Sequence, residues 1–278
     1  MTTLRRPSRG AGGRTTAAAL CLAGLLPACL LPSSGMAAAP SGIPAGAPQG
    51  GPGSLAGVWF NAKFSTNRDD NLPQELPRAR TTLDGQPPPY QPWAQAEVEK
   101  RIAGFREGRP QAKLSASCIP GGTPQMMQPP PQLPIQILET PGQVTVLFES
   151  LSTFRIIRMN EEHPADPDPT FFGNSVGHWE GDTLVVDTIA LKEATTIDDV
   201  VPHSDQLHVV ERLRRTGPAT MEILATIEDP RTFTRPYTYR FSFKRVPGQK
   251  LREFICENNR NAPDADGRTT AQLRSAGE

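Results

Sequence analysis

The chain has 278 residues, of which 37% are hydrophobic and 21% are charged, a composition typical of globular proteins and unlike that of disordered chains. Basic and acidic residues number 29 each. Four of the arginines lie within the first 14 residues, which contain no acid, so the remainder carries 25 basic against 29 acidic residues, a net charge of −4. This balance gives no general attraction to nucleic acid, and we predict no nucleic-acid partner.

Residues 1–39 have the order of a signal peptide. Four arginines are followed by the apolar run 15–31 and then by small residues that end in Met36-Ala37-Ala38-Ala39. The apolar run is shorter than the ~20 residues that span a bilayer. We therefore expect a periplasmic or secreted bacterial protein. A retained membrane anchor is one alternative, and a lipoprotein acylated at Cys29, after Leu26-Pro27-Ala28, is another. Membrane contact is expected only in these two alternatives.

The next segments indicate a linker, a first strand and one helix. Residues 40–53 are rich in Pro, Gly and Ala and predict a flexible linker. A single domain is expected over 54–260, with a disordered tail at 261–278. Residues 55–60 predict a short apolar strand. Pro92 begins a helix signal, WAQAEVEKRIAGFREG, whose partial apolar stripe is typical of a surface helix.

From Leu133 onward the sequence changes to strands. Tyr237, Tyr239, Phe241 and Phe243 alternate with polar residues, a period of two that indicates antiparallel strands with one wet face. About nine strands joined mostly by short turns predict a mainly β meander that closes into a lipocalin-like barrel, because closure removes exposed sheet edges. The expected strands after the first are 135–140, 143–149, 153–159, 174–179, 183–191, 206–214, 220–228, 237–246 and 250–257.

Cysteine usage indicates one disulfide. If Cys21 and Cys29 belong to the signal peptide, Cys118 and Cys256 remain. In an oxidising compartment an even pair favours a bond between them; two separate buried thiols are the alternative. No CxxC or Cys/His metal spacing is present, which disfavours a structural zinc site.

Two resemblances accompany this pattern. Gly57-Val58-Trp59 resembles the G-x-W triplet that opens lipocalin-type barrels. The stretch from about 118 to 260 resembles a large family of exported bacterial proteins of uncharacterised activity. The family resemblance rests on a few phrases: HPAD at 163–166, GHWEGDTLVVDT at 177–188, PHS at 202–204, LHV at 207–209, ER at 211–212 and CENNR at 256–260. The resemblance implies export and no particular reaction.

All four histidines fall within residues 163–208, in a stretch that also contains several aspartates. Histidine beside a carboxylate is the usual pair for acid–base catalysis near neutral pH. We therefore predict a catalytic site at a barrel mouth, formed by His163, His203, His208, Asp166 and Asp199. The alternatives are that these residues only shape turns, that His208 is a barrel-wall residue, or that His163, His203 and an aspartate hold a divalent metal.

Asp187 and the aromatic residues complete the predicted site. Asp187 lies among apolar residues and is expected to be paired with Arg155, Arg158, Arg212 or a histidine. The expected substrate-binding residues are Trp179, Tyr237, Tyr239 and Phe241; for the tyrosine and phenylalanine face, a plain hydrophobic core is the alternative.

These observations favour a cofactor-independent enzyme that performs elimination, hydration or isomerisation on a small hydrophobic or aromatic compound. The sequence contains neither βαβ units nor a Gly-rich phosphate loop, which disfavours a nucleotide-binding fold. A non-catalytic carrier of an apolar ligand and a structural or interaction protein of the cell envelope are the alternatives. The oligomeric state is not indicated.

Overall fold

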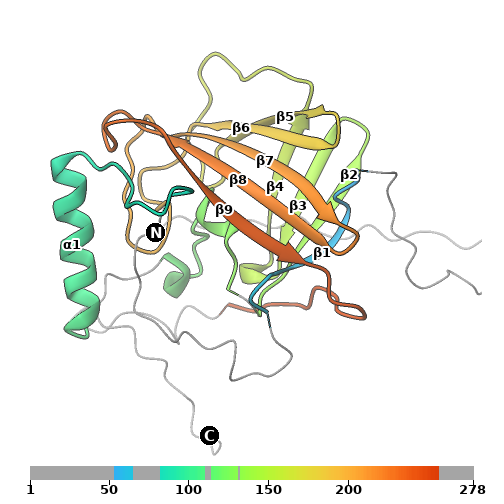
Figure 1. Ribbon diagram of the computed structural model, residues 1–278, viewed down its shortest axis with the longest axis horizontal. Coiled ribbons are helices and arrows are strands. Elements are labelled where there is room, and N and C mark those ends of the chain that lie inside the picture. The colour runs from blue at the N-terminus through green and yellow to red at the C-terminus, as the bar shows by residue number, and fades with distance from the viewer. Residues whose placement is uncertain (1–52, 65–81, 110–113, 131, 257–278) are drawn as a thin grey trace, which may run out of the picture. The chain divides into compact units, whose positions relative to one another are not determined.

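The barrel predicted from the alternating strands is present. The computed structural model describes residues 53–64, 82–109, 114–130 and 132–256, all within the second of two compact units, Gly46–Glu278. Within these ranges, nine strands form one closed barrel, and one long helix precedes eight of them (Figure 1). The predicted mainly β class is therefore confirmed. The predicted signal peptide, nearly all of the linker and the predicted tail lie outside the described residues.

The strands pair in chain order, and β9 returns to pair with β1. Tight turns with glycine at positive φ, such as Gly142 (76°) and Gly181 (62°), join β2 to β3 and β5 to β6. The strand bounds are β1 Gly57–Asn61, β2 Ile135–Thr140, β3 Gln143–Phe148, β4 Thr153–Met159, β5 Asn174–Glu180, β6 Thr183–Ile189, β7 His208–Gly217, β8 Thr220–Glu228 and β9 Tyr237–Lys244.

One strand pair departs from the predicted antiparallel meander. β4 and β5 are parallel and share only the pairs Arg158–Val176 and Met159–Gly177. Residues 160–173 connect them and run back along the barrel; we call this segment the crossover. Parallel neighbours require such a long return, and the three prolines within residues 163–169 favour an extended connection over a tight hairpin.

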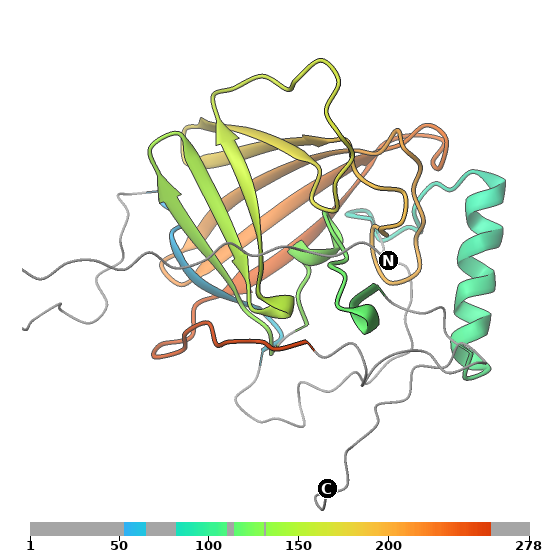
Figure 2. The same cartoon turned by 180° about the vertical axis from the view of Figure 1, so that it is seen from behind.

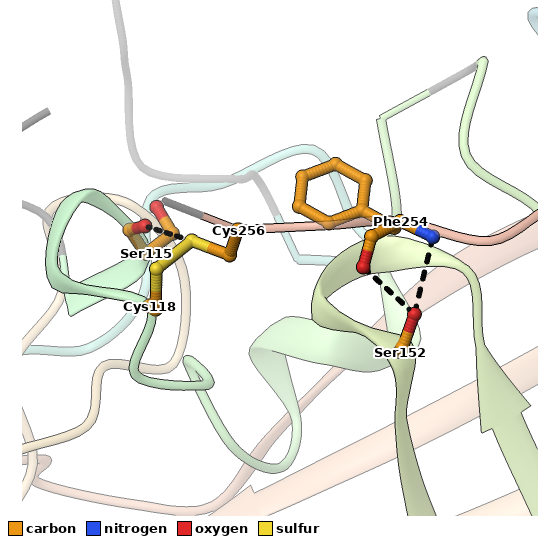
Figure 3. The surroundings of a disulfide bond; sticks show 5 residues. All are labelled: Ser115, Cys118, Ser152, Phe254 and Cys256. Atoms are coloured by element: carbon orange, nitrogen blue, oxygen red, sulfur yellow. Dashed lines mark hydrogen bonds between the residues drawn. A yellow bond between two sulfur atoms is a disulfide. The ribbon is translucent and has the colours of Figure 1, made fainter. Parts of the chain in front are cut away.

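The strand predicted at 250–257 is wrong. Residues 251–256 are irregular, because β9 already pairs with β1 and the closed barrel offers no edge to a further strand. Instead, the predicted disulfide between Cys118 and Cys256 is confirmed and fastens this segment. Ser152 Oγ donates to the Phe254 carbonyl (2.9 Å) and accepts from its amide (3.2 Å), as Figure 3 shows.

Trp59 and Arg245 pack together where the β7–β8 hairpin turns. Trp59 is fully buried, and its Nε1 donates to the Leu55 carbonyl (2.7 Å). The Arg245 guanidinium lies 4.6 Å from the centre of the Trp59 ring and donates to the Ala56 carbonyl (2.6 Å). Gly57 has φ of 133°, and a Cβ there would lie 3.1 Å from the guanidinium. The Gly-x-Trp triplet therefore gives the arginine room to cover this end of the barrel.

Helix α1 (Pro92–Arg106) and the β6–β7 loop lie at the opposite end (Figures 1 and 2). The Gln91 amide donates to the Thr232 carbonyl (2.8 Å), and Val98 is buried in the main core. Ile197, Val200 and Val201 of the loop belong to the same core. The predicted surface helix is thus half-embedded at this end. None of the helices in the described part of the chain has the length and apolarity needed to cross a membrane. The short 3-10 turns are η2 Leu114–Ser117, η3 Gln125–Met127 and η4 Ser150–Ser152.

Candidate functional site

Two of the predicted histidines meet at Asp187 on the outside of the barrel. The neighbours of Asp187 on β6, Val186 and Thr188, are fully buried, so Asp187 itself points outward. His163 Nε2 lies 3.0 Å from Asp187 Oδ1, and His208 Nε2 lies 3.0 Å from both carboxylate oxygens. Asn174 and Glu228 flank the group. We call this cluster the outer histidine centre: His163, Asn174, Asp187, His208 and Glu228.

The two histidines of this centre differ in what their ring nitrogens can do. His163 lies on the crossover, and its Nδ1 is 2.7 Å from Asn174 Oδ1 while its Nε2 faces Asp187. Both nitrogens are therefore occupied, and His163 fastens the crossover to the barrel wall. His208 faces Asp187 through Nε2, but its Nδ1 lies 3.6 Å from Glu228 Oε2, beyond hydrogen-bond distance. Of the two histidines, His208 is the one whose second ring nitrogen makes only a long ion-pair contact, with Glu228, and can therefore exchange a proton.

The carboxylate and the imidazole of this centre shift each other's pKa. The hydrogen bond to Asp187 raises the pKa of His208, and the same bond lowers the pKa of Asp187. The raised histidine pKa stabilises the fold below 6.5 and this contribution is lost as the pH rises through the folded-state pKa. The lowered aspartate pKa stabilises the fold above 3.8 and is lost as the pH falls. The pair therefore contributes most between these two values.

We expect His208→Gln to remove this pH dependence. At pH 5.5 the variant should lose about 0.5 kcal/mol of unfolding free energy, a small value because both side chains are partly exposed. At pH 9 the two proteins should be equally stable. Urea unfolding at several pH values measures the difference, with His178→Gln, an exposed histidine beside Glu180, as the control. Equal losses at both pH values would contradict the assignment.

His203 does not join the outer histidine centre. It is buried in the β6–β7 loop, where its Nε2 lies 2.7 Å from Thr195 Oγ1 and its Nδ1 2.8 Å from the Ser204 carbonyl. Burial lowers the pKa of His203. The ring nitrogen Nδ1 donates to the Ser204 carbonyl, and Nε2 lies against the Thr195 hydroxyl, which itself donates to the Lys192 carbonyl (2.9 Å). These contacts fix the loop, as do the bonds of the neighbouring Ser204 to Asp229 (2.7 Å).

Three further predicted site residues are exposed. Asp166 lies on the crossover, three residues after His163, and Trp179 near the far end of β5 is 38% exposed. Asp199 accepts a hydrogen bond from Gln125 Nε2 (3.3 Å) and is exposed. Neither aspartate has a hydrogen bond to a histidine among those found between described residues. The partner of the histidines is instead Asp187, whose pairing with a histidine was one of the predicted alternatives.

A second polar cluster lies inside the barrel. Arg155 on β4 and Glu211 on β7 are 1% and 0% exposed, and Arg155 Nη2 lies 2.6 Å from Glu211 Oε2. Arg155 also donates from Nε to Ser175 Oγ (3.1 Å) and from Nη2 to Thr188 Oγ1 (2.8 Å). We call Arg155 and Glu211 the interior ion pair.

The interior ion pair is incompletely hydrogen-bonded. Arg155 Nη1 and both carboxylate oxygens of Glu211 are buried and have no hydrogen-bond partner among the described residues; the 2.6 Å contact is an ion pair without hydrogen-bond angles. From the sequence, Arg155 was predicted only as a possible partner of Asp187, and Glu211 was not predicted as a site residue. The available signal was the alternation, because Glu211 falls in phase with Val209 and Leu213, both buried.

The predicted aromatic residues face the same interior. Tyr237, Tyr239 and Phe241 are 5%, 3% and 5% exposed, and neighbouring rings lie 4.8–6.0 Å apart. Burial raises the pKa of Tyr237 well above its usual value, which keeps its hydroxyl protonated. We call these three residues the aromatic row. Register places Glu211 beside Ala225, and Ala225 beside Tyr239, on adjacent strands.

No protein family, curated protein or solved structure matches this chain. The assignment of function therefore depends on the geometry of the two clusters. Within the described ranges, no group of three or more His, Cys, Asp or Glu residues is arranged to hold a metal ion. Outside the barrel, His208 can exchange a proton. Inside the barrel, the interior ion pair can form hydrogen bonds with a ligand and the aromatic row can pack against it.

Proposed function

We propose that this protein is an exported small-molecule-binding barrel whose ligand lies inside, against the interior ion pair and the aromatic row. The observation that carries the proposal is the buried N–H and carboxylate oxygens without hydrogen-bond partners among the described residues. Each such group costs about 1–3 kcal/mol when left unsatisfied, and native proteins contain few of them. A molecule that enters the barrel and bonds to these atoms would offset that cost.

The neighbouring side chains support an aromatic or apolar ligand body. Glu211, Ala225 and Tyr239 occupy three adjacent strands at one level, so about 10 Å separates the outer two backbones. Ala225 between them has only a methyl group. A flat molecule that bonds to Glu211 would thus lie beside the ring of Tyr239, in the edge or stacked contact that aromatic groups prefer.

Export is part of the same proposal. The Cys118–Cys256 disulfide is typical of proteins in oxidising compartments. The signal-like residues 1–39 and the resemblance to exported bacterial proteins agree with a periplasmic or secreted location. Acylation at Cys29 would add a membrane anchor; both the signal and Cys29 lie outside the described residues.

A second candidate function is acid–base catalysis at the outer histidine centre. Asp187 holds the Nε2 side of His208, which leaves Nδ1 directed toward Glu228. A carboxylate that orients a partly exposed imidazole is the arrangement of a general base. This candidate keeps His163 as a positioning residue and assigns no catalytic part to His203, whose two nitrogens are occupied in the loop.

One experiment addresses both candidates. We expect native mass spectrometry of the full chain, purified from a bacterial periplasm, to reveal a copurifying small molecule with an aromatic or apolar body. Binding of that molecule should fall at least tenfold in Tyr239→Ala and stay unchanged in His208→Gln. If the molecule is instead converted, and conversion stops in His208→Gln, the second candidate is correct. A protein that carries no molecule and binds none from a periplasmic extract would contradict the first.

A further inference from the structure

We propose that the interior ion pair selects ligands with an uncharged head group that carries a hydrogen-bond donor beside an acceptor, as in an amide, lactam or urea. This inference rests on the proposed function, because it names the class of molecule that the interior takes. The inference is based on the buried polar atoms of the pair that have no hydrogen-bond partner among the described residues. Arg155 Nη1 is a donor and needs an acceptor, whereas Glu211 Oε1 is an acceptor and needs a donor.

The charges of the pair decide against an ionic ligand. Arg155 and Glu211 are in direct contact at 2.6 Å and are both at most 1% exposed, so their charges cancel. A ligand carboxylate would gain from Arg155 but would face the Glu211 carboxylate, and a ligand cation would meet the opposite conflict. Either ion would also lose its hydration without a counter-charge of its own. A neutral group that both accepts and donates avoids these costs.

The rest of the shell of Arg155 is already occupied. Nε donates to Ser175 and Nη2 donates to Thr188, and these two hydroxyls also contact each other at 3.1 Å. The guanidinium is thereby held in one orientation, with Nη1 as its remaining donor. A preorganised donor and acceptor of this kind discriminates strongly between head groups, because a ligand that lacks either function leaves a buried group unpaired.

Three matched probes test the inference: benzamide, benzoate and toluene share one ring and differ in the head group. We expect saturation-transfer NMR titrations of the full chain at pH 7 to show benzamide binding at least tenfold more tightly than toluene or benzoate. In Arg155→Met/Glu211→Leu, benzamide and toluene should bind within about twofold of each other. The control Arg158→Met/Glu161→Leu removes an exposed ion pair between the end of β4 and the crossover and should keep the preference for benzamide.

A charge change gives a second, independent arm if the double variant fails to fold. Glu211→Gln keeps the shape of the side chain and removes its charge, so Arg155 becomes an unbalanced cation. Benzoate affinity should then rise at least tenfold over that of the unaltered protein. An unchanged benzoate affinity in this variant would place the ligand away from the pair.

The outcomes separate the inference from the function beneath it. Equal binding of benzamide and toluene would overturn the head-group assignment and leave interior binding intact. Tighter binding of benzoate would mean that Arg155 alone determines recognition. Binding of none of the three, with an ordered water on Arg155 Nη1 in a crystal soaked with benzamide, would overturn both the inference and the proposed function.

Discussion

Glu211→Leu should destabilise the barrel by about 3–5 kcal/mol, the cost of leaving one member of a buried ion pair without its partner. Without this carboxylate, the Arg155 guanidinium is a buried charge that has lost its partner. The guanidinium is 1% exposed and cannot turn toward water without disrupting β4. Arg155→Met should cost a similar amount, because it strands the Glu211 carboxylate. Urea unfolding, followed by tryptophan fluorescence and far-UV circular dichroism, measures both values.

The double variant Arg155→Met/Glu211→Leu is the control. Apolar residues of similar volume remove both charges, so its unfolding free energy should return to within about 2 kcal/mol of the unaltered protein or exceed it. Additive losses in the double variant would show that the two residues act independently, and the contact seen between β4 and β7 would then carry no energetic coupling. Single and double apolar substitutions in the surface pair Arg212–Glu180 should lower the unfolding free energy by at most about 1 kcal/mol.

Removing the disulfide is the second change with a large expected effect. Cys118 and Cys256 are separated by 138 positions, and the chain-entropy model assigns about 5 kcal/mol to closing a loop of that size. Cys118→Ser/Cys256→Ser should therefore unfold at a clearly lower urea concentration. Most strands of the barrel lie between the two cysteines, so the constraint acts on the whole unfolded domain.

Ser152→Ala provides the matched control for the disulfide. It removes the hydrogen bonds that Ser152 makes with Phe254 but keeps the covalent link. Its cost should be about 1 kcal/mol, and reduction of the unaltered protein should reproduce the Cys→Ser variant. Equal stability of the reduced and oxidised proteins would mean that the C-terminal segment contributes nothing beyond its local contacts.

Strand alternation was the most informative local signal. The period of two in Tyr237–Phe243 predicted a strand with one wet face, and the odd-numbered residues of this strand are buried. The disulfide also followed from the sequence, because once Cys21 and Cys29 are assigned to the signal peptide only one pairing remains. A strand is predicted from the alternation of a few neighbouring residues, and a disulfide is predicted from the small number of cysteines that can pair. Features of these two kinds can therefore be predicted from the sequence.

In the predicted site, the local sequence pattern did not predict which carboxylate pairs with the histidines. His163 and His208 lie beside a carboxylate, and that carboxylate is Asp187 rather than Asp166 or Asp199. Nearness in the chain favoured Asp166, which lies three residues after His163. The crossover between two parallel strands instead carries His163 to Asn174 and Asp187, an arrangement that depends on the pairing of β4 with β5.

By itself, the sequence predicted nine of the strands, the barrel class and the helix at Pro92, and it favoured the cysteine pair. Only the tertiary structure decided that Asp187 and His208 face outward while Arg155 and Glu211 meet inside. Both decisions depend on register, because a shift of one residue turns every side chain of a strand to the other face. The physical reason is that a strand's own pattern tells which residues share a face, whereas the partners across the barrel are set by the closure of all nine strands.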